Sequence, residues 1–267
     1  MKLLVSDIDG TLTYENGVNY PSVAPVNQIA VRKWMEAGNV FAVATARVHT
    51  TADWFMNDLG MRVDYLGGNG AESVYADGTC QIRMIPSYVF LKTAKWLDEQ
   101  NINATIKMNY AHHFYYYKNT NYPFTCESRM RKTLRTAEDY QLLNLTGEEG
   151  VCNMSVLTKE RIQDVKDYIN TTFADVCSAV CSDYDNVDFI PKGSSKSIAI
   201  QELAKRYHLS SDDVYVIGDS ENDISMFSVT GHSYAMAQAS DEVKRQAAHV
   251  VNTVSEAILG ILEEDTI

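Results

Sequence analysis

The sequence carries little positive charge. Its 267 residues include 23 Lys and Arg against 35 Asp and Glu, which gives a formal net charge of −12 at pH 7. A basic surface broad enough for DNA or RNA is therefore not expected. Because the acidic field of such a chain repels anions, an anionic substrate would need a local positive site.

The sequence also lacks long apolar runs and an even number of cysteines. No stretch of about 18 uncharged apolar residues occurs, so we expect no membrane span. The apolar run at 2–6 is too short for a signal peptide, and five cysteines without such a signal favour reduced thiols. These absences predict a cytoplasmic protein. The chain is long enough for one large domain or two modest ones.

Short apolar runs alternate with helical patterns at the beginning and the end of the chain. An uninterrupted apolar run is typical of a strand that is buried on both faces of a parallel sheet. We predict strands at 2–6, 39–44, 65–66, 214–217, 233–236 and 250–251, and helices at 25–37, 48–59, 197–208, 240–248 and 254–263. This alternation predicts a doubly wound, Rossmann-like α/β fold with a parallel sheet.

The middle third of the chain has a different character, because aromatic and β-forming residues gather there as in antiparallel strands. We predict a helix from Pro86 onward, strands within 104–117, a helix at 127–143, a strand at 151–157, a helix at 159–172 and two short strands within 176–190. This mixture predicts an α+β domain at 83–188 that is inserted into a core made of 1–82 and 189–267.

Four of the predicted strands lead into polar residues. Ligands of open α/β sheets bind outside the carboxyl ends of the strands, so neighbouring parallel strands would bring these residues to one crevice. The polar clusters are Asp7 with Asp9, Thr45 with Arg47, Asn69, and Asp219 with Asn222 and Asp223. One Asp-x-Asp-Gly sequence is often only a turn, but the four clusters together predict a functional site.

The carboxylates among these residues predict a bound cation. Asp7, Asp9, Asp219 and Asp223 would repel one another in one crevice unless a cation is present or protons are taken up. Oxygen ligands without a nearby His or Cys suit a hard cation, and Mg²⁺ is the expected one. Because Mg²⁺ commonly binds one or two carboxylates together with a substrate phosphate, the expected substrate is a phosphate ester.

The same residues suggest a reaction. A carboxylate can attack phosphorus and form an aspartyl-phosphate, which water then hydrolyses. Asp7 follows its strand directly and is the predicted nucleophile, while Asp9 is the predicted general acid and base. Thr45 and Lys196 are the predicted donors to the oxygens of the transferring phosphoryl group.

These residues resemble the four motifs of the haloacid dehalogenase superfamily, and their order and spacing resemble its Cof-type, class IIB branch. The resemblance rests on Asp7-Ile8-Asp9-Gly10-Thr11-Leu12, Thr45, Asn69-Gly70-Ala71, Lys196 and Gly218-Asp219-Ser220-Glu221-Asn222-Asp223. It implies a Mg²⁺-dependent phosphatase that acts on sugar phosphates or related small metabolites. It also implies that the inserted α+β domain is a cap that contacts the leaving group.

The resemblance also implies a role for each site residue. The metal ligands would be Asp7, Asp9 through its backbone carbonyl, Asp219 and Asp223. The substrate-binding residues would be Gly10, Thr11, Arg47, Asn69 and Asn222.

Two positions depart from the family pattern. Ala46 stands where the second motif usually has Gly, and Gln238 stands where an Asn is common near the C-terminus. Because Ala lacks the freedom of Gly at positive φ, we expect the loop at Ala46 to differ. Gln238 can replace the Asn as a donor but reaches further.

Two other functions stay open at the level of the sequence. A sugar phosphomutase or another phosphotransferase could use the same nucleophile, Asp7, and pass the phosphoryl group to a hydroxyl. A non-catalytic phosphate sensor could use the same pocket, but Asp9 would then be unnecessary. We expect a small phosphorylated metabolite as the partner of a monomer or a dimer, with no nucleic acid and no membrane.

Overall fold

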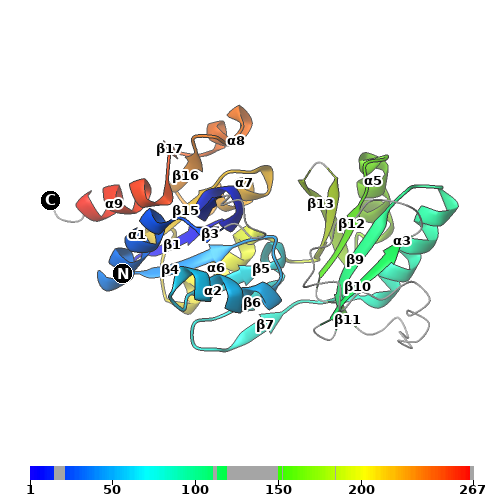
Figure 1. The fold of residues 1–267 in the computed structure, drawn as a ribbon, viewed down its shortest axis with the longest axis horizontal. Coiled ribbons are helices and arrows are strands. Elements are labelled where there is room, and N and C mark those ends of the chain that lie inside the picture. The colour runs from blue at the N-terminus through cyan, green and yellow to red at the C-terminus, as the bar shows by residue number, and fades with distance from the viewer. Residues whose placement is uncertain (15–21, 111–112, 119–149, 152, 184, 265–267) are drawn as a thin grey trace. The chain divides into compact units, whose positions relative to one another are not determined.

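The computed structural model describes residues 1–14, 22–110, 113–118, 150–151, 153–183 and 185–264. The chain divides into two compact units (Figure 1). Unit 1 comprises Met1–Gln81 and Ser195–Ile267, and unit 2 comprises Ile82–Ser194. The second junction lies beyond the predicted residue 188 because the last strand of unit 2 continues to Pro191.

Unit 1 is built on an eight-stranded sheet with β1 in its interior. The order is β17 (His249–Val251), β16 (His232–Met236), β15 (Val214–Gly218), β1 (Leu3–Ser6), β4 (Val40–Ala44), β5 (Asp64–Gly67), β6 (Glu72–Val74) and β7 (Cys80–Ile82). All pairings from β17 to β5 are parallel, and β6 runs antiparallel to β5. The parallel sheet and the α/β class confirm the predicted fold.

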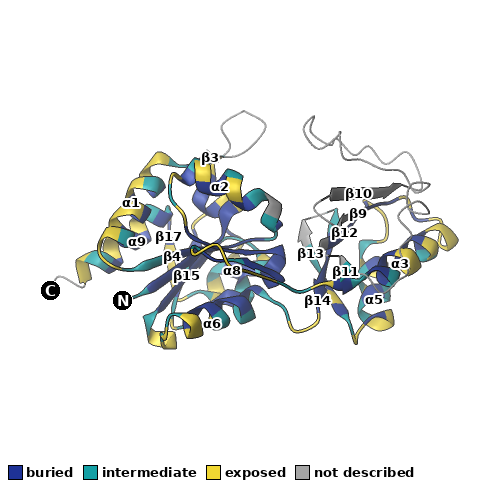
Figure 2. Cartoon of the chain, turned by 90° about the horizontal axis from the view of Figure 1, so that it is seen from below, coloured by how far each residue is buried: buried dark blue, intermediate teal, exposed yellow. Residues whose placement is uncertain are grey.

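Both faces of this sheet are covered by helices, which explains the uninterrupted apolar runs (Figure 2). Along β1, Leu4 belongs to one hydrophobic cluster, while Leu3 and Val5 belong to the other, because side chains alternate across a strand. The first face packs against α1 (Pro25–Glu36), α2 (Ala52–Leu59) and α9 (Val254–Glu264). The second packs against α6 (Lys196–Arg206), α7 (Ile224–Phe227) and α8 (Asp241–Gln246).

Unit 2 has an antiparallel sheet of its own. The order is β10 (His113–Lys118), β9 (Thr105–Tyr110), β12 (Asn153–Leu157), β14 (Asn186–Pro191) and β13 (Cys177–Asp183). A third hydrophobic cluster joins this sheet to α3 (Ser87–Glu99) and α5 (Ile162–Thr172). The helix predicted at 127–143 lies outside the described residues.

Two short antiparallel ladders lie outside these two sheets. In unit 1, β2 (Thr13–Tyr14) pairs with β3 (Ser22–Val23). In unit 2, β8 (Ile85–Pro86) pairs with β11 (Gly150–Val151). Within the described ranges, every helix is too short or too polar to cross a membrane.

Candidate active site

The polar residues predicted from the sequence gather at the carboxyl edge of the sheet in unit 1. From β1 the chain proceeds to β4 and β5 on one side, and later returns to place β15 on the other side of β1. The strand order therefore reverses between β1 and β15, and ligands of doubly wound sheets bind at such a reversal. Asp7 follows β1 and Asp219 follows β15, so both stand at this point.

Lys196 is a buried positive group of the site. It is the first residue of α6, and its Nζ lies 2.7 Å from Oδ1 of Asp7 and 2.6 Å from Oδ1 of Asp223. The side chains of Lys196 and Asp223 are 1% and 0% exposed, and that of Asp7 is 8% exposed. The ammonium group thus joins two buried carboxylates that come from distant parts of the chain.

Burial and charge act on these groups in opposite directions. Burial alone would lower the pKa of Lys196, but the carboxylates of Asp7 and Asp223 raise it, so Lys196 stays protonated. Burial raises the pKa of Asp7, and the nearby carboxylates of Asp223 and Asp219 add to this rise, while Lys196 opposes it. Asp7 is therefore a carboxylate whose ionised form depends on positive charge beside it.

Asp219 is fixed by the first loop of the chain. The Thr11 hydroxyl donates to Oδ1 of Asp219 at 2.7 Å. Gly10 has φ of +79°, and a Cβ there would lie 2.5 Å from Oδ2 of Asp219, so only glycine fits this turn. Burial raises the pKa of Asp219, and Asp223 adds to the rise.

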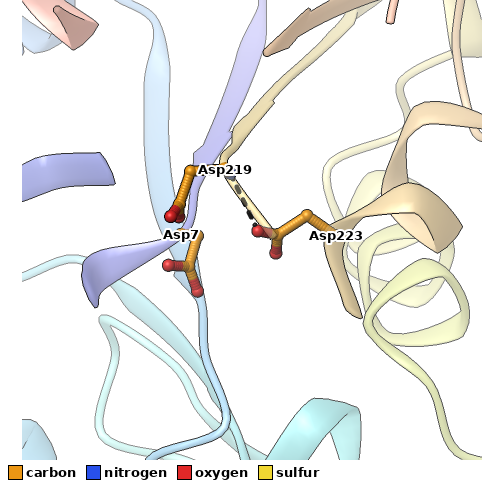
Figure 3. A group of neighbouring side chains, drawn as sticks. All are labelled: Asp7, Asp219 and Asp223. Atoms are coloured by element: carbon orange, nitrogen blue, oxygen red, sulfur yellow. Dashed lines mark hydrogen bonds between the residues drawn. The ribbon is translucent and has the colours of Figure 1, made fainter. Parts of the chain in front are cut away.

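Three carboxylates converge in a way that fits a cation (Figure 3). Asp7, Asp219 and Asp223 each offer an oxygen, and these oxygens lie within 4.8 Å of one another. The donor set is all oxygen, as a hard divalent cation such as Mg²⁺ prefers. Asp223 differs from the other two because both of its oxygens already accept hydrogen bonds: Oδ1 from Lys196, and Oδ2 from the backbone N–H groups of Asp219 and Ser220.

Asp9 lies apart from this cluster. Its two carboxylate oxygens accept from Nε and Nη2 of Arg47, each at 2.7 Å, in a bidentate ion pair. The Asp9 side chain is 46% exposed and that of Arg47 is 22% exposed. The Arg47 guanidinium also lies 5.4 Å from the centre of the Trp54 ring. Asp9 is therefore held by Arg47 while remaining in contact with solvent.

Thr45 and Asn69 stand at the ends of two neighbouring strands and are both buried. The backbone N–H of Asn69 donates to the Thr45 carbonyl at 2.9 Å. The Thr45 hydroxyl oxygen accepts from the N–H of Arg47 at 3.1 Å, which leaves its own proton for a ligand. Ala46 does not adopt a positive φ, so alanine fits the backbone of this loop without strain.

The loop after β5 packs directly against the start of α6. Gly70 has φ of +90°, and a Cβ there would lie 2.1 Å from the Ser195 carbonyl oxygen. Nearby, Nδ2 of Asn222 lies 3.5 Å from Oδ1 of Asn69, at the limit of a hydrogen bond. All of the residues predicted for the site lie in unit 1, at this edge of the sheet.

Three residues near the site fall outside the motif pattern or depart from it. Gln238 donates to the Gly10 carbonyl at 2.5 Å, so the residue that departs from the family pattern supports the first loop. Glu72 and His49 form a pair behind the Thr45 loop, with 2.8 Å between Oε2 and Nδ1. The sequence contains an indication that Glu72 is special, because it is the charged residue in the otherwise uncharged run from Gly70 to Ala76.

The comparison with protein families defines the class. The model of the haloacid dehalogenase-like hydrolases matches residues 4–263 of this chain. The chain therefore belongs to this family of hydrolases, as the sequence motifs predicted.

Individual relatives are more distant or are matched only in part. The 5-amino-6-(5-phospho-D-ribitylamino)uracil phosphatase YwtE of Bacillus subtilis is 41% identical over 70 residues, which are 26% of this chain and 24% of that protein. Pyridoxal phosphate phosphatase YbhA of Escherichia coli is 24% identical, with 94% of this chain and 93% of that protein covered.

A solved structure gives the same fold. The crystal structure of a haloacid dehalogenase-like hydrolase from Bacteroides thetaiotaomicron superimposes with a TM-score of 0.79 at 22% identity. The alignment covers 97% of this chain and 99% of that one. At this identity the likeness concerns the fold.

Proposed function

We propose that this chain is a Mg²⁺-dependent phosphatase of small phosphorylated metabolites, with sugar phosphates as the expected class. The observation that carries the proposal is the buried ammonium of Lys196 between Asp7 and Asp223, beside Asp219. A phosphatase needs a nucleophile, positive charge for the phosphoryl oxygens and a proton donor for the leaving alcohol. Unit 1 has a candidate for each of them, and the named phosphatases among the relatives support the class.

Asp7 is the proposed nucleophile. Its Oδ1 accepts from Lys196, which leaves Oδ2 to attack phosphorus. The attack forms an aspartyl-phosphate as the bond between phosphorus and the ester oxygen breaks. Lys196 and the Thr45 hydroxyl donate to phosphoryl oxygens, and the electrostatic stabilisation that such preorganised donors supply is usually the largest single contribution to catalysis.

Asp9 is the proposed general acid and base. It gives a proton to the leaving oxygen, then takes one from the water that attacks the aspartyl-phosphate and releases inorganic phosphate and the Asp7 carboxylate. A general acid or base positioned in this way raises the reaction rate by roughly 10²–10⁴-fold. Arg47 orients the carboxylate through its two hydrogen bonds, and the 46% exposure of Asp9 lets it exchange protons with solvent.

Asp7, Asp219 and the backbone carbonyl of Asp9 would hold the Mg²⁺. When bound, the cation supplies positive charge that offsets the negative charge of the carboxylates and of one phosphoryl oxygen. Asp223 is proposed to orient Lys196 and the backbone of Asp219, because hydrogen bonds already engage both of its oxygens. Unit 2 is proposed as the cap that contacts the leaving group.

The proposal is tested by release of phosphate from a panel of phosphorylated metabolites, with Mg²⁺ and with EDTA. We expect EDTA and Asp7→Asn each to lower the rate by roughly 10³-fold or more, because the carboxylate charge or the cation is lost. Asn retains the oxygen that accepts from Lys196, so the fold should persist. Asp241→Asn, at a side chain that is 88% exposed, is the control and should keep full activity.

Other outcomes point to the alternatives. A phosphosugar isomer formed without free phosphate would identify a mutase. No turnover of any ester by folded protein that Mg²⁺ stabilises against heat would favour a sensor. Full activity in Asp7→Asn would refute the proposed nucleophile.

A further inference from the structure

A fully buried carboxylate lies outside the residues used so far. Glu72 is the first residue of β6, and its side chain is 0% exposed. Its Oε2 accepts from the backbone N–H of His49 at 2.5 Å and lies 2.8 Å from Nδ1 of the same residue. Its Oε1 has no hydrogen-bond partner in the part of the chain that the structure describes. Burying a carboxylate costs several kcal/mol, so the interaction with His49 is what retains it there.

His49 stands at the end of the loop that carries Thr45 and Arg47. Backbone hydrogen bonds tie this loop to the end of β5 and the loop that follows it. Thr45 donates to the Leu66 carbonyl at 2.8 Å, and Asn69 donates to the Thr45 carbonyl at 2.9 Å. Gly68 donates to the Arg47 carbonyl at 2.8 Å. The two loops are thus joined step by step as far as Arg47.

The Glu72 side chain continues this series by one step. Beyond Arg47, the Val48 carbonyl accepts a long bond from the Tyr65 hydroxyl at 3.4 Å, and the His49 N–H then donates to the Glu72 carboxylate. A hydrogen bond to a charged acceptor is about twice as strong as one between neutral groups. The backbone of Arg47 is therefore held directly at its own carbonyl and indirectly through His49, two residues further on.

We propose that Glu72 is a positioning residue for the proposed phosphatase. By holding His49 it fixes the backbone that carries Arg47, and through the Arg47 guanidinium it fixes the carboxylate of Asp9. This inference rests on the proposed function, because Asp9 has its meaning as an acid and base there. Glu72 itself does not touch the substrate.

The first test compares two substitutions of Glu72. Glu72→Met keeps the length of the side chain and removes the acceptor, while Glu72→Gln keeps an acceptor oxygen without the charge. We expect kcat to fall by about 10- to 100-fold in Glu72→Met, as for a misplaced catalytic group, with KM changed little. The kcat of Glu72→Gln should lie much closer to that of the wild type. If Glu72→Met does not fold, Glu72→Gln still allows the effect on kcat to be measured.

A matched control separates positioning from stability. Asp64 is also a buried carboxylate of the same sheet, and it accepts from the N–H of Ala76 and the hydroxyl of Tyr207, each at 2.8 Å. Neither bond reaches the loop of Arg47. Asp64→Asn should therefore keep the kcat of the wild type even where it lowers the melting temperature.

A double-mutant cycle with Arg47→Ala identifies the route of the effect. If Glu72 acts through Arg47, the loss of kcat caused by Glu72→Met should shrink to less than about 2-fold in the Arg47→Ala background. The same loss in both backgrounds, or an equal loss in Asp64→Asn, would overturn the inference and leave Glu72 as a structural residue.

Hydrogen exchange gives a readout that needs no activity. We expect the His49 amide to exchange slowly in the wild type, and the amides of His49 and Gly68 to exchange faster in Glu72→Met than in Asp64→Asn. If the wild type has no phosphatase activity but shows this exchange pattern, the proposed function is refuted, while the inference that Glu72 holds the loop at His49 stands. If the His49 amide exchanges at the rate of an unfolded chain, the inference that Glu72 holds this loop is refuted.

Discussion

The surroundings of Lys196 set the energetics of the site at the scale of single residues. Its ammonium is buried with two carboxylates, and removing one partner from such a buried group costs about 3–5 kcal/mol. If the proposed function holds, we expect changes at Asp7, Asp223 or Lys196 to alter both stability and activity. Variants that keep the shape and remove only charge are the informative ones.

Substitution of Gly70 by alanine should destabilise the protein both by backbone strain and by a steric clash, and a second glycine allows the two effects to be separated. Gly70→Ala would place a Cβ 2.1 Å from the Ser195 carbonyl oxygen, next to Lys196. Gly38→Ala is the control, because Gly38 has φ of +82° and nothing within 4 Å of its Cβ position. We expect about 1–2 kcal/mol of destabilisation from positive φ in each variant, and roughly 2 kcal/mol more in Gly70→Ala.

Urea unfolding of the two glycine variants measures this difference, and phosphate release measures its consequence. Only Gly70→Ala should lose activity, because only there is the start of α6 displaced. Equal stabilities of the two variants would mean that the backbone at Ser195 moves freely.

The His49–Glu72 pair predicts a dependence of stability on pH. The hydrogen bond to Glu72 raises the pKa of His49 above its ordinary value of 6.5, against the opposing effect of burial. A raised pKa in the folded state contributes stability that is complete below about pH 6.5 and is lost as the pH rises through the folded pKa. The stability difference between the wild type and Glu72→Gln should therefore shrink from about pH 6 to pH 9.

Denaturant unfolding at a series of pH values tests this dependence. Glu242→Gln, at an exposed residue of α8, serves as the control and should show a difference from the wild type that does not follow the titration of His49. A difference for Glu72→Gln that stays constant with pH would show that His49 does not change its charge in this range.

At the scale of elements, the start of α6 is the part that places a catalytic candidate. Ser195 caps the helix, and its hydroxyl oxygen accepts from the N–H of Ile198 at 3.1 Å. Lys196 is the next residue, so the cap holds the turn from which the ammonium group projects. We therefore expect this cap to support the proposed site as well as the stability of the helix.

A pair of capping variants tests this dual role. Ser240 caps α8 in the same way, accepting from the N–H of Val243, but no catalytic candidate follows it. We expect Ser195→Ala and Ser240→Ala each to cost about 1 kcal/mol of stability. Thermal unfolding should give similar shifts, while only Ser195→Ala should lower the rate of phosphate release. A normal rate in Ser195→Ala would show that Lys196 is held by its ion pairs alone.

The elements that the sequence predicted well are those with an uninterrupted apolar pattern. The runs that form β1, β4 and β15 are predictable because both of their faces are buried, so nearly every residue in them is apolar. The sequence does not predict β6 or the edge strand β7, since Glu72 and the exposed residues of Cys80–Ile82 break that pattern. Tertiary pairing, which a local pattern does not contain, makes strands of them.

The site residues were predictable to a different degree. Asp7, Thr45 and Asp219 follow clear strands, so their convergence could be inferred from the sheet alone. The partners of Asp9 and Glu72 could not be inferred in this way, because they depend on the path of a loop and on one side chain reaching across to it. Spacing predicts which residues meet at an edge, whereas contacts between loops require the folded backbone.

At the scale of the whole molecule, the hydrophobic clusters follow the division into units. Two clusters draw their buried residues from unit 1 alone, and the third draws its own from unit 2 alone. Each unit therefore has a core of its own, as independently folding domains do. The candidate active site lies within unit 1.

This separation predicts the outcome of an excision. A chain in which Ile82–Ser194 is replaced by a short Gly/Ser linker should fold as one cooperative unit, measured by circular dichroism during heating. If unit 2 is the cap, this chain should still hydrolyse p-nitrophenyl phosphate with Mg²⁺ but lose the ranking of substrates in the metabolite panel. A folded excised chain that retains the wild-type ranking would place specificity in unit 1.

The interior position of β1 also determines when the site can form during synthesis. β4 leaves the ribosome soon after β1, but β15 follows only after the whole of unit 2 has been translated. At roughly 5–20 residues per second, a nascent chain needs about 10–40 s to reach β15. Throughout that interval one edge of β1 is unpaired, and unpaired edges are prone to aggregate. Unit 2, which is contiguous in the sequence, is fully translated by then, so it can assemble before unit 1, into which it is inserted.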